Sequence, residues 1–265
     1  MTARHWQDLT TEEIAGLDRG RTVVVLPVAA IEQHGPHLPV GTDAMINEGV
    51  LARALALAPA PLPLLALPGM AIGKSNEHQD FAGTLTLSAE TLIRMLTEVV
   101  ESVARARLRK LILLNSHGGQ PQILDIVAQD ARARLGMIAV VANCWRMMDR
   151  EALFPPAERE VGLHGGGVET ALMLHLRPDL VRRDRIRDFP SAARKLEKDY
   201  PSLSAGGRLA FAWQAQDLNE SGAVGDARLG TAEIGCKLVE SAAVRLVRLA
   251  EELSRLPPEL VDHRA

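Results

Sequence analysis

The 265-residue sequence is poor in aromatic residues, which make up 3% of it, and it contains two cysteines. With so few aromatic side chains, the core must be built mainly from Ala, Leu and Val. Cys144 and Cys236 belong to no CxxC motif, which argues against a thiolate metal site and predicts free, buried or semi-buried thiols. No apolar run approaches the roughly 20 residues that a membrane-spanning helix needs. Because the N-terminal segment also lacks a signal-peptide core, we expect a cytoplasmic protein with no membrane partner.

A large excess of one charge is also missing. The formal net charge is −3, from 30 Lys and Arg against 33 Asp and Glu. Nucleic-acid-binding proteins usually carry a concentrated basic patch, so no nucleic-acid partner is expected. The chain is 47% hydrophobic and 24% charged, which is ordinary for a globular protein.

Strand-like apolar runs alternate with helical segments along the chain. Strands are predicted at residues 21–29, 63–70, 109–119 (which ends in a Gly-rich turn) and 137–145, and helices at 8–17, 44–58, 88–108, 120–136, 166–176 and about 232–256. This alternation predicts an α/β fold, a three-layer α/β/α sandwich with a mainly parallel central sheet. We expect one domain over residues 1–265, since no linker marks a second. Residues 184–230 are the least regular and are expected to form an insertion or an oligomer contact.

The segment AIEQHGPHLPVGTD, residues 30–43, concentrates acidic and imidazole side chains directly after the first predicted strand. Its prolines and glycines and its lack of helical periodicity predict a loop, with Glu32, His34, His37 and Asp43 close together. Acidic and imidazole groups at the carboxyl end of a strand are costly to bury unpaired, and a divalent cation would satisfy them together. Oxygen and nitrogen ligands without a thiolate suit Zn, Mn or Fe(II).

Two further histidines lie in Gly-rich turns after predicted strands. His117 is part of NSHGGQ, and His164 is part of LHGGGVET, which places Glu169 at the start of a helix. Glycines permit close backbone approach and positive φ angles, which a core histidine does not require. A first-turn glutamate also interacts favourably with the helix dipole. Because Glu169 occurs together with histidines that are flanked by glycines, the motif nevertheless indicates a metal or catalytic site.

These motifs resemble those of the creatininase family of amidohydrolases. EQHGPHLPVGTD, SNEHQDFAGTLTLS, NSHGGQ and HGGGVET occur in the family's order, and the likeness runs from about residue 20 to 250. The resemblance implies metal-dependent cleavage of a non-standard C–N amide bond in a small molecule, such as a cyclic amide or a formamide. It also implies two divalent metal ions, Zn, Mn or Fe, that activate water and polarise the amide carbonyl.

The resemblance assigns roles to individual residues. It implies that Asp43 bridges two metal ions, one held also by Glu32 and His117 and the other by His34 and Glu169. It implies that His164 orients a ligand or contacts the substrate and that His78 lies on a loop near the site. Because a proton must reach the leaving nitrogen, His164 is the candidate for proton transfer, with His78 as the alternative. Substrate contacts are expected from Trp145, His37, Ser75, Gly118 and Gly119. An orienting contact to a metal ligand is the alternative role for His37.

Gly119 departs from creatininase itself, which has a glutamate two positions after the histidine of this motif. The departure weakens the case for creatinine as the substrate and leaves one metal less well held. Relatives with the same HGG loop include formamide hydrolases and a peptidase that acts on a small modified peptide. Such a peptidase, or a non-catalytic protein that binds a metal or a small molecule, is therefore the alternative. The family also implies a homo-oligomer, with a hexamer as the form of relatives.

Overall fold

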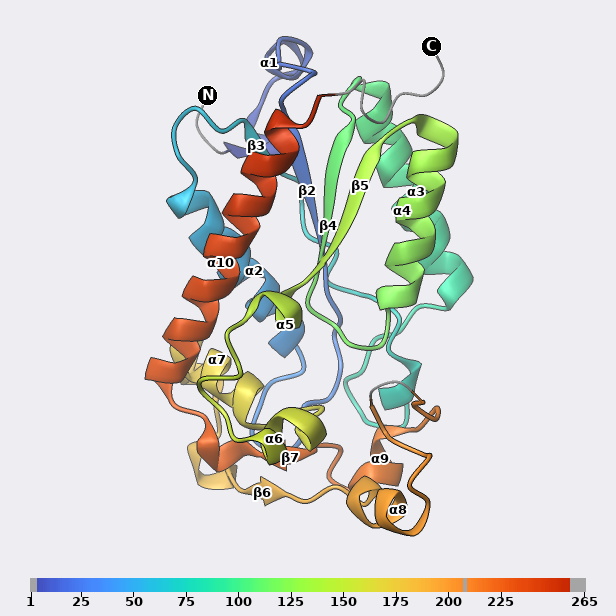
Figure 1. Ribbon diagram of the computed structural model, residues 1–265, viewed down its shortest axis with the longest axis vertical. Coiled ribbons are helices and arrows are strands. Elements are labelled where there is room, and N and C mark those ends of the chain that lie inside the picture. The colour runs from blue at the N-terminus through green and yellow to red at the C-terminus, as the bar shows by residue number, and fades with distance from the viewer. Residues whose placement is uncertain (1–3, 207–208, 258–265) are drawn as a thin grey trace.

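The computed structural model describes residues 4–206 and 209–257. Its central sheet has five strands, all parallel, in the order β1-β3-β2-β4-β5 (Figure 1). The strands are β1 (Arg4–His5), β2 (Val23–Val28), β3 (Leu64–Ala66), β4 (Lys110–Asn115) and β5 (Ile138–Asn143). Val28 pairs with Asn115, and Asn115 pairs with Asn143. The carboxyl ends of β2, β4 and β5 therefore lie at one level, where ligands bind in parallel sheets.

Helices cover both faces of this sheet. One layer contains α2 (Thr42–Leu57), α7 (Gly167–Leu176) and α10 (Ala232–Arg255), and the other contains α3 (Ala89–Arg105) and α4 (Pro121–Leu135) (Figure 1). Successive side chains of β2 point to opposite faces, so Val23 and Val25 join the core of the first layer, while Val24 and Leu26 join that of the second. The predicted three-layer α/β/α sandwich is confirmed.

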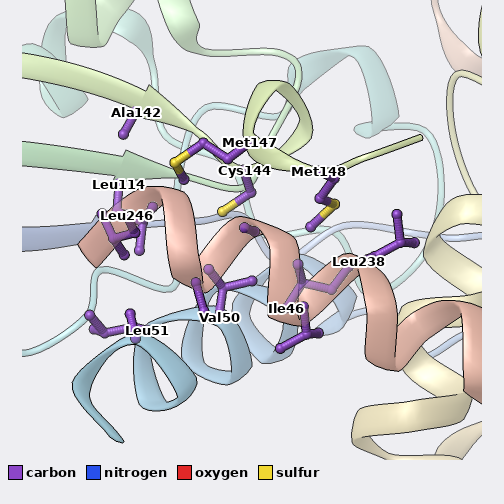
Figure 2. Packing of buried hydrophobic residues seen from close by; sticks show 14 of the residues in the cluster. Ile46, Val50, Leu51, Leu114, Ala142, Cys144, Met147, Met148, Leu238 and Leu246 are labelled. Atoms are coloured by element: carbon purple, nitrogen blue, oxygen red, sulfur yellow. The ribbon is translucent and has the colours of Figure 1, made fainter. Parts of the chain in front are cut away.

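The core of the first layer lies between α2, α10 and the sheet. Ile46 and Val50 of α2 share this cluster with Leu238 and Leu246 of α10 (Figure 2). The short helix α5 (Cys144–Met147) adds Cys144 as a buried free thiol. Cys236 is also free but is exposed, which corrects the expectation that both thiols are at least partly buried.

Several predicted boundaries shift in the structure. The strand predicted at 63–70 is only three residues long, because Pro68 and Gly69 cannot continue it well. Asp43 was predicted to lie in the loop, but it lies in the first turn of α2. Trp145 was predicted to end a strand, but it lies in the short helix α5. Thr10 and Ser88 cap the N-termini of α1 and α3 through their side chains, and Gly136 ends α4 in the left-handed conformation.

The remaining elements surround the carboxyl ends of the strands or begin the chain. They are α1 (Thr11–Ala15), α6 (Pro156–Val161), α8 (Ala193–Asp199), α9 (Ala215–Leu218), the antiparallel pair β6 (Asp188–Phe189) and β7 (Gly225–Asp226), and the 3-10 turns η1 (Trp6–Asp8), η2 (Asn76–His78), η3 (Pro178–Leu180), η4 (Arg183–Arg185) and η5 (Ala227–Leu229). Short, scattered elements in residues 184–230 agree with the predicted irregularity. Within the described ranges, no helix is long and apolar enough to cross a membrane.

Candidate metal centre and its pocket

Five polar side chains converge at the carboxyl ends of β2 and β4. Glu32 and His34 come from the loop after β2, Asp43 from the start of α2, His117 from the turn after β4, and Glu169 from the first turn of α7. Each of the five is no more than 8% exposed. The structure thus brings together all five predicted ligands, although they span almost 140 positions of the sequence.

Asp43 lies between two imidazole rings. Its Oδ2 is 3.2 Å from His117 Nδ1, and its Oδ1 is 3.4 Å from His34 Nε2. Glu32 Oε2 is also 3.2 Å from His117 Nδ1. Glu169 Oε1 is 3.8 Å from His34 Nε2. Asp43 thus lies between a histidine on either side, and Glu32 is also within 4.0 Å of His34.

Both histidines turn one ring nitrogen toward the carboxylates. His34 Nδ1 lies 3.0 Å from the carbonyl oxygen of Glu32, and His117 Nε2 lies 2.9 Å from that of Lys74. A ring nitrogen that faces a carbonyl carries the proton, so the opposite nitrogen is left free to bind a cation. His34 Nε2 and Asp43 Oδ2 are buried and have no hydrogen-bond partner within residues 4–206 and 209–257. The donor set and these two orphaned atoms fit a pair of divalent ions.

The electrostatics of the cluster attract positive charge. Burial lowers the pKa of His34, but the carboxylates of Glu169, Asp43 and Glu32 outweigh burial and raise that pKa to about 10. Burial is likewise outweighed at His117, mainly by Glu32, and its pKa is raised well above the usual value. Burial raises the pKa of Glu169 to about 7, and the charge of Asp43 adds to the shift. A metal cation bound here would therefore have to displace protons.

Three histidine rings stack beside the carboxylates. The ring centroids of His34 and His164 are 4.2 Å apart, as are those of His164 and His78. Burial lowers the pKa of His78 to about 3, and the positive charge of His34 lowers it further. Burial and the positive charge of His34 also hold the pKa of His164 well below its usual value. His78 and His164 are therefore neutral at pH 7.

The comparisons with known proteins identify the family of this chain. The creatininase family model, described as creatinine amidohydrolase, matches residues 7–250. The chain belongs to the creatininase family. It is 33% identical over 232 residues to a mycofactocin precursor peptide peptidase of Mycobacterium tuberculosis (85% of this chain, 83% of the relative). It is 32% identical over 202 residues to a creatinine amidohydrolase of Pseudomonas putida (70% of this chain, 76% of the relative).

Solved structures of creatininase share this fold. A mutant creatininase complexed with creatine has a TM-score of 0.77 at 25% identity, over 95% of this chain and 99% of that one. A mutant creatininase described as Zn-Zn type has the same score and identity, over 97% of this chain and all of the other.

The cluster of acidic and imidazole side chains opens into a cavity of about 620 Å³. Nine predicted site residues line it: Glu32, Asp43, His78, His117, Gly118, Gly119, Trp145, His164 and Glu169. His34, His37 and Ser75 lie behind its wall. His37 Nε2 is 3.0 Å from Thr170 Oγ1, beside Glu169, and its ring stacks on Phe189. Ser75 Oγ donates to Glu32 Oε2. These positions agree with orienting roles for His37 and Ser75 rather than with substrate contact.

The Gly-rich turn before α7 is held by a buried carboxylate. Glu158 accepts hydrogen bonds from the backbone N–H groups of Gly167 and Asp226, both at 2.7 Å. Gly165 has a φ of 64° and its N–H donates to Glu169. A Cβ at Gly166 would collide with Glu158 Oε1. The glycines are thus required by the close approach of Glu158 and by the positive φ, and they fix Glu169 in the site.

Several residues of the pocket were not predicted from the sequence. Glu77, in the turn η2, lies 3.3 Å from His117 Nε2 and forms an ion pair of 3.1 Å with Lys74. Burial raises the pKa of Glu77, but its hydrogen bond to His117 and the positive charges of His117 and Lys74 outweigh burial, so that this pKa is lowered. Its place directly before His78 in the motif SNEHQD is the signal that could have revealed it. Arg150, Arg159, Phe211 and Trp213 also line the cavity, and nothing in their local sequence marks them.

Proposed function

We propose that this protein is a metal-dependent hydrolase that cleaves a non-standard C–N amide bond in a cyclic amide, a formamide or a small modified peptide. The observation that carries the proposal is the position of Asp43, whose two oxygens face His34 and His117 from between them. A carboxylate shared in this way is typical of sites that hold two divalent ions. Membership of the creatininase family supports the same reaction class.

The residues proposed to hold the ions are Asp43 on both, Glu32 and His117 on one, and His34 and Glu169 on the other. When bound, two such ions would supply an acidified water molecule and polarise the amide carbonyl. Zn, Mn and Fe all suit this set of oxygen and nitrogen ligands.

His164 is proposed to move the proton. Its Nε2–H donates to the carbonyl oxygen of Gln33, and its Nδ1 faces Glu32 Oε1 at 3.7 Å. Because the ring is neutral, Nδ1 would first accept a proton from the attacking water and then deliver it to the leaving nitrogen. His78 is the alternative, since its Nε2 is 3.7 Å from the same oxygen of Glu32, but Gln33 Nε2 donates to its Nδ1 and fixes its ring.

A small modified peptide is a reasonable substrate class for two reasons. A relative named as a mycofactocin precursor peptide peptidase matches 85% of this chain. The cavity of about 620 Å³ is within the range that accommodates drug-sized ligands, which exceed creatinine in size. Creatinine is expected to be a poor substrate.

Metal analysis followed by an amide panel tests the proposal. The purified chain is loaded with Zn, Mn or Fe(II), its metal content is measured, and it is offered creatinine, formamido-pyrimidines, small lactams and short peptides. Two ions per chain with hydrolysis of at least one amide is the expected result. Two ions with tight substrate binding but no turnover would favour a non-catalytic binding protein. No bound metal after loading would contradict the proposal. Light scattering on the same sample tests the predicted homo-oligomer.

A further inference from the structure

Two arginines stand on the pocket wall formed by the segment between β5 and α7. Arg159 lies in α6, and Arg150 lies in the turn that precedes it, where its backbone carbonyl accepts from the N–H groups of Leu153 and Phe154. Both side chains line the same cavity as Glu32, Asp43 and Glu169. Neither arginine takes part in the metal cluster described above.

These two guanidinium groups lack adequate partners within the protein. The nearest carboxylate to Arg159 is that of Glu151, 4.0 Å away on a side chain that is 91% exposed. The Nε of Arg159 is buried and has no hydrogen-bond partner among the described residues. Within the same residues, Arg150 has neither a side-chain hydrogen bond nor an ion pair within 4 Å. Burial lowers the pKa of Arg150, and the charge of Arg159 lowers it further.

Lys74, on the opposite wall, differs from the arginines because its charge is already satisfied. Its Nζ is 3.1 Å from Glu77 and also donates to the carbonyl oxygen of Gly119. The unsatisfied positive charge in this cavity therefore belongs to Arg150 and Arg159. A half-buried pair of like charges is unfavourable, and an anion between them would relieve the repulsion.

The loaded pocket would be positive as a whole. The described acidic residues that line it are Glu32, Asp43, Glu77 and Glu169. Two divalent ions would outweigh the three carboxylates of the cluster by one charge, and Glu77 is neutralised by Lys74. The two arginines then add two further positive charges. A positively charged cavity with low-dielectric walls concentrates anionic ligands.

Aromatic side chains gather in the same cavity. Trp145, Phe211 and Trp213 line it, although the whole chain has only four Phe, three Trp and one Tyr. Aromatic walls offer flat apolar surface to a ligand. Besides the cluster of proposed metal ligands, the pocket therefore offers a ligand both an apolar aromatic surface and the positive charge of the two arginines.

We propose that Arg150 and Arg159 form a subsite for an oxyanion group, a carboxylate or a phosphate, and that the enzyme selects amides that carry one. This rests on the proposed amidohydrolase function. The planar guanidinium fork matches the oxygens of both groups and can bind them with two parallel hydrogen bonds. The selected substrate is thus an anionic amide with a flat or apolar portion.

The experiment measures binding to the zinc-loaded full chain by calorimetry. The three probes share one scaffold: N-formyl-phenylalanine, its neutral carboxamide, and the phosphonate in which phosphorus replaces the carboxyl carbon. We expect at least one anionic probe to bind the wild type about tenfold or more tightly than the carboxamide. The carboxylate and phosphonate arms identify which oxyanion is preferred.

The variants are Arg150→Gln, Arg159→Gln and their double. We expect the double variant to lose the preference while its zinc content stays at the wild-type level. Arg159→Lys keeps the charge but not the fork, and should retain only part of the preference. Arg94→Gln on α3, where the side chain is 83% exposed, is the matched control and should bind like the wild type.

Three results would overturn the subsite: no anionic preference in the wild type, an undiminished preference in the double variant, or no measurable binding of either anionic probe. The second result would mean that the metal ions themselves hold the anion. Failure of the proposed function would give a different result. If the chain bound anions through these arginines but hydrolysed no amide in the panel, the subsite would stand and the proposed hydrolase function would be wrong.

Discussion

The carboxylate of Glu77 occupies the space into which a side chain at Gly119 would extend. A Cβ built on Gly119 would collide with Glu77 Oε1 and would lie 2.6 Å from His117 Nε2. The sequence resemblance indicates that creatininase has a glutamate at this position. Here a carboxylate reaches the same region from the turn η2, so the absence of an acidic residue at position 119 does not leave His117 without a carboxylate neighbour.

Replacing Glu77 should weaken metal binding on the His117 side. Glu77 contacts the outer nitrogen of His117 at 3.3 Å, and such contacts orient a ligating ring and raise its basicity. Glu77→Gln should lower the affinity for one of the two ions by ~10–100-fold, measured by competition with a chelator. Glu98→Gln, at an exposed ion pair on α3, is the control. Equal affinities in Glu77→Gln and the wild type would show that Glu77 does not support the site.

Replacing Asp43 should remove both metal ions, because its two oxygens face the two histidines. Asp43→Ala, loaded as the wild type is, should contain far less than one ion per chain by elemental analysis. Asp130→Ala, on the exposed surface of α4, should keep the full content. If Asp43→Ala still held two ions, the shared carboxylate would have to be a different residue.

Replacing His164 should separate proton transfer from metal binding. The ring lies beside the cluster but is neutral, and its Nδ1 is oriented toward Glu32. His164→Ala should keep its metal content and lose ~10²–10⁴ in kcat. A structural role predicts a lower Tm with unchanged turnover per folded molecule. Metal content, Tm and kcat measured on one preparation decide between the two, and full occupancy with an unchanged kcat would shift the role to His78.

The stability of the protein should depend on pH through His37. Burial lowers the pKa of His37 to about 4 in the folded state, against about 6.5 in the unfolded chain. Between these values the unfolded state binds the proton and the folded state does not, so the contribution of His37 is complete above pH 6.5 and declines toward pH 4.

His37→Gln, which removes the titrating ring, should therefore lose less stability than the wild type between pH 7.5 and 4.5. Thermal unfolding of the two metal-free proteins across this range is the measurement. Other acidic transitions are common to both proteins and cancel in the difference. Parallel pH profiles would show that the pKa of His37 is the same in the folded and unfolded states.

The sequence predicts the layers of the fold well, because runs such as VVVLPV and KLILLN are too apolar and too short for anything but buried strands. The five clustered residues were also predicted, since each lies in a motif next to a strand end or a helix start. Asp43 was assigned to the wrong element because Gly41 ends the loop without a side-chain cap to mark the helix start. Phe211 and Trp213 reach the pocket only through tertiary packing, which no local pattern of residues records.

The stack of His34, His164 and His78 has a consequence for proton transfer. The positive charge of His34 lowers the proton affinity of both neighbours, so a second proton on the stack is held only weakly. Hydrolysis of an amide takes one proton from water and returns one to the departing nitrogen. In the proposed reaction His164 would therefore carry its proton only briefly, and its ring would become neutral again as soon as that proton reaches the departing nitrogen.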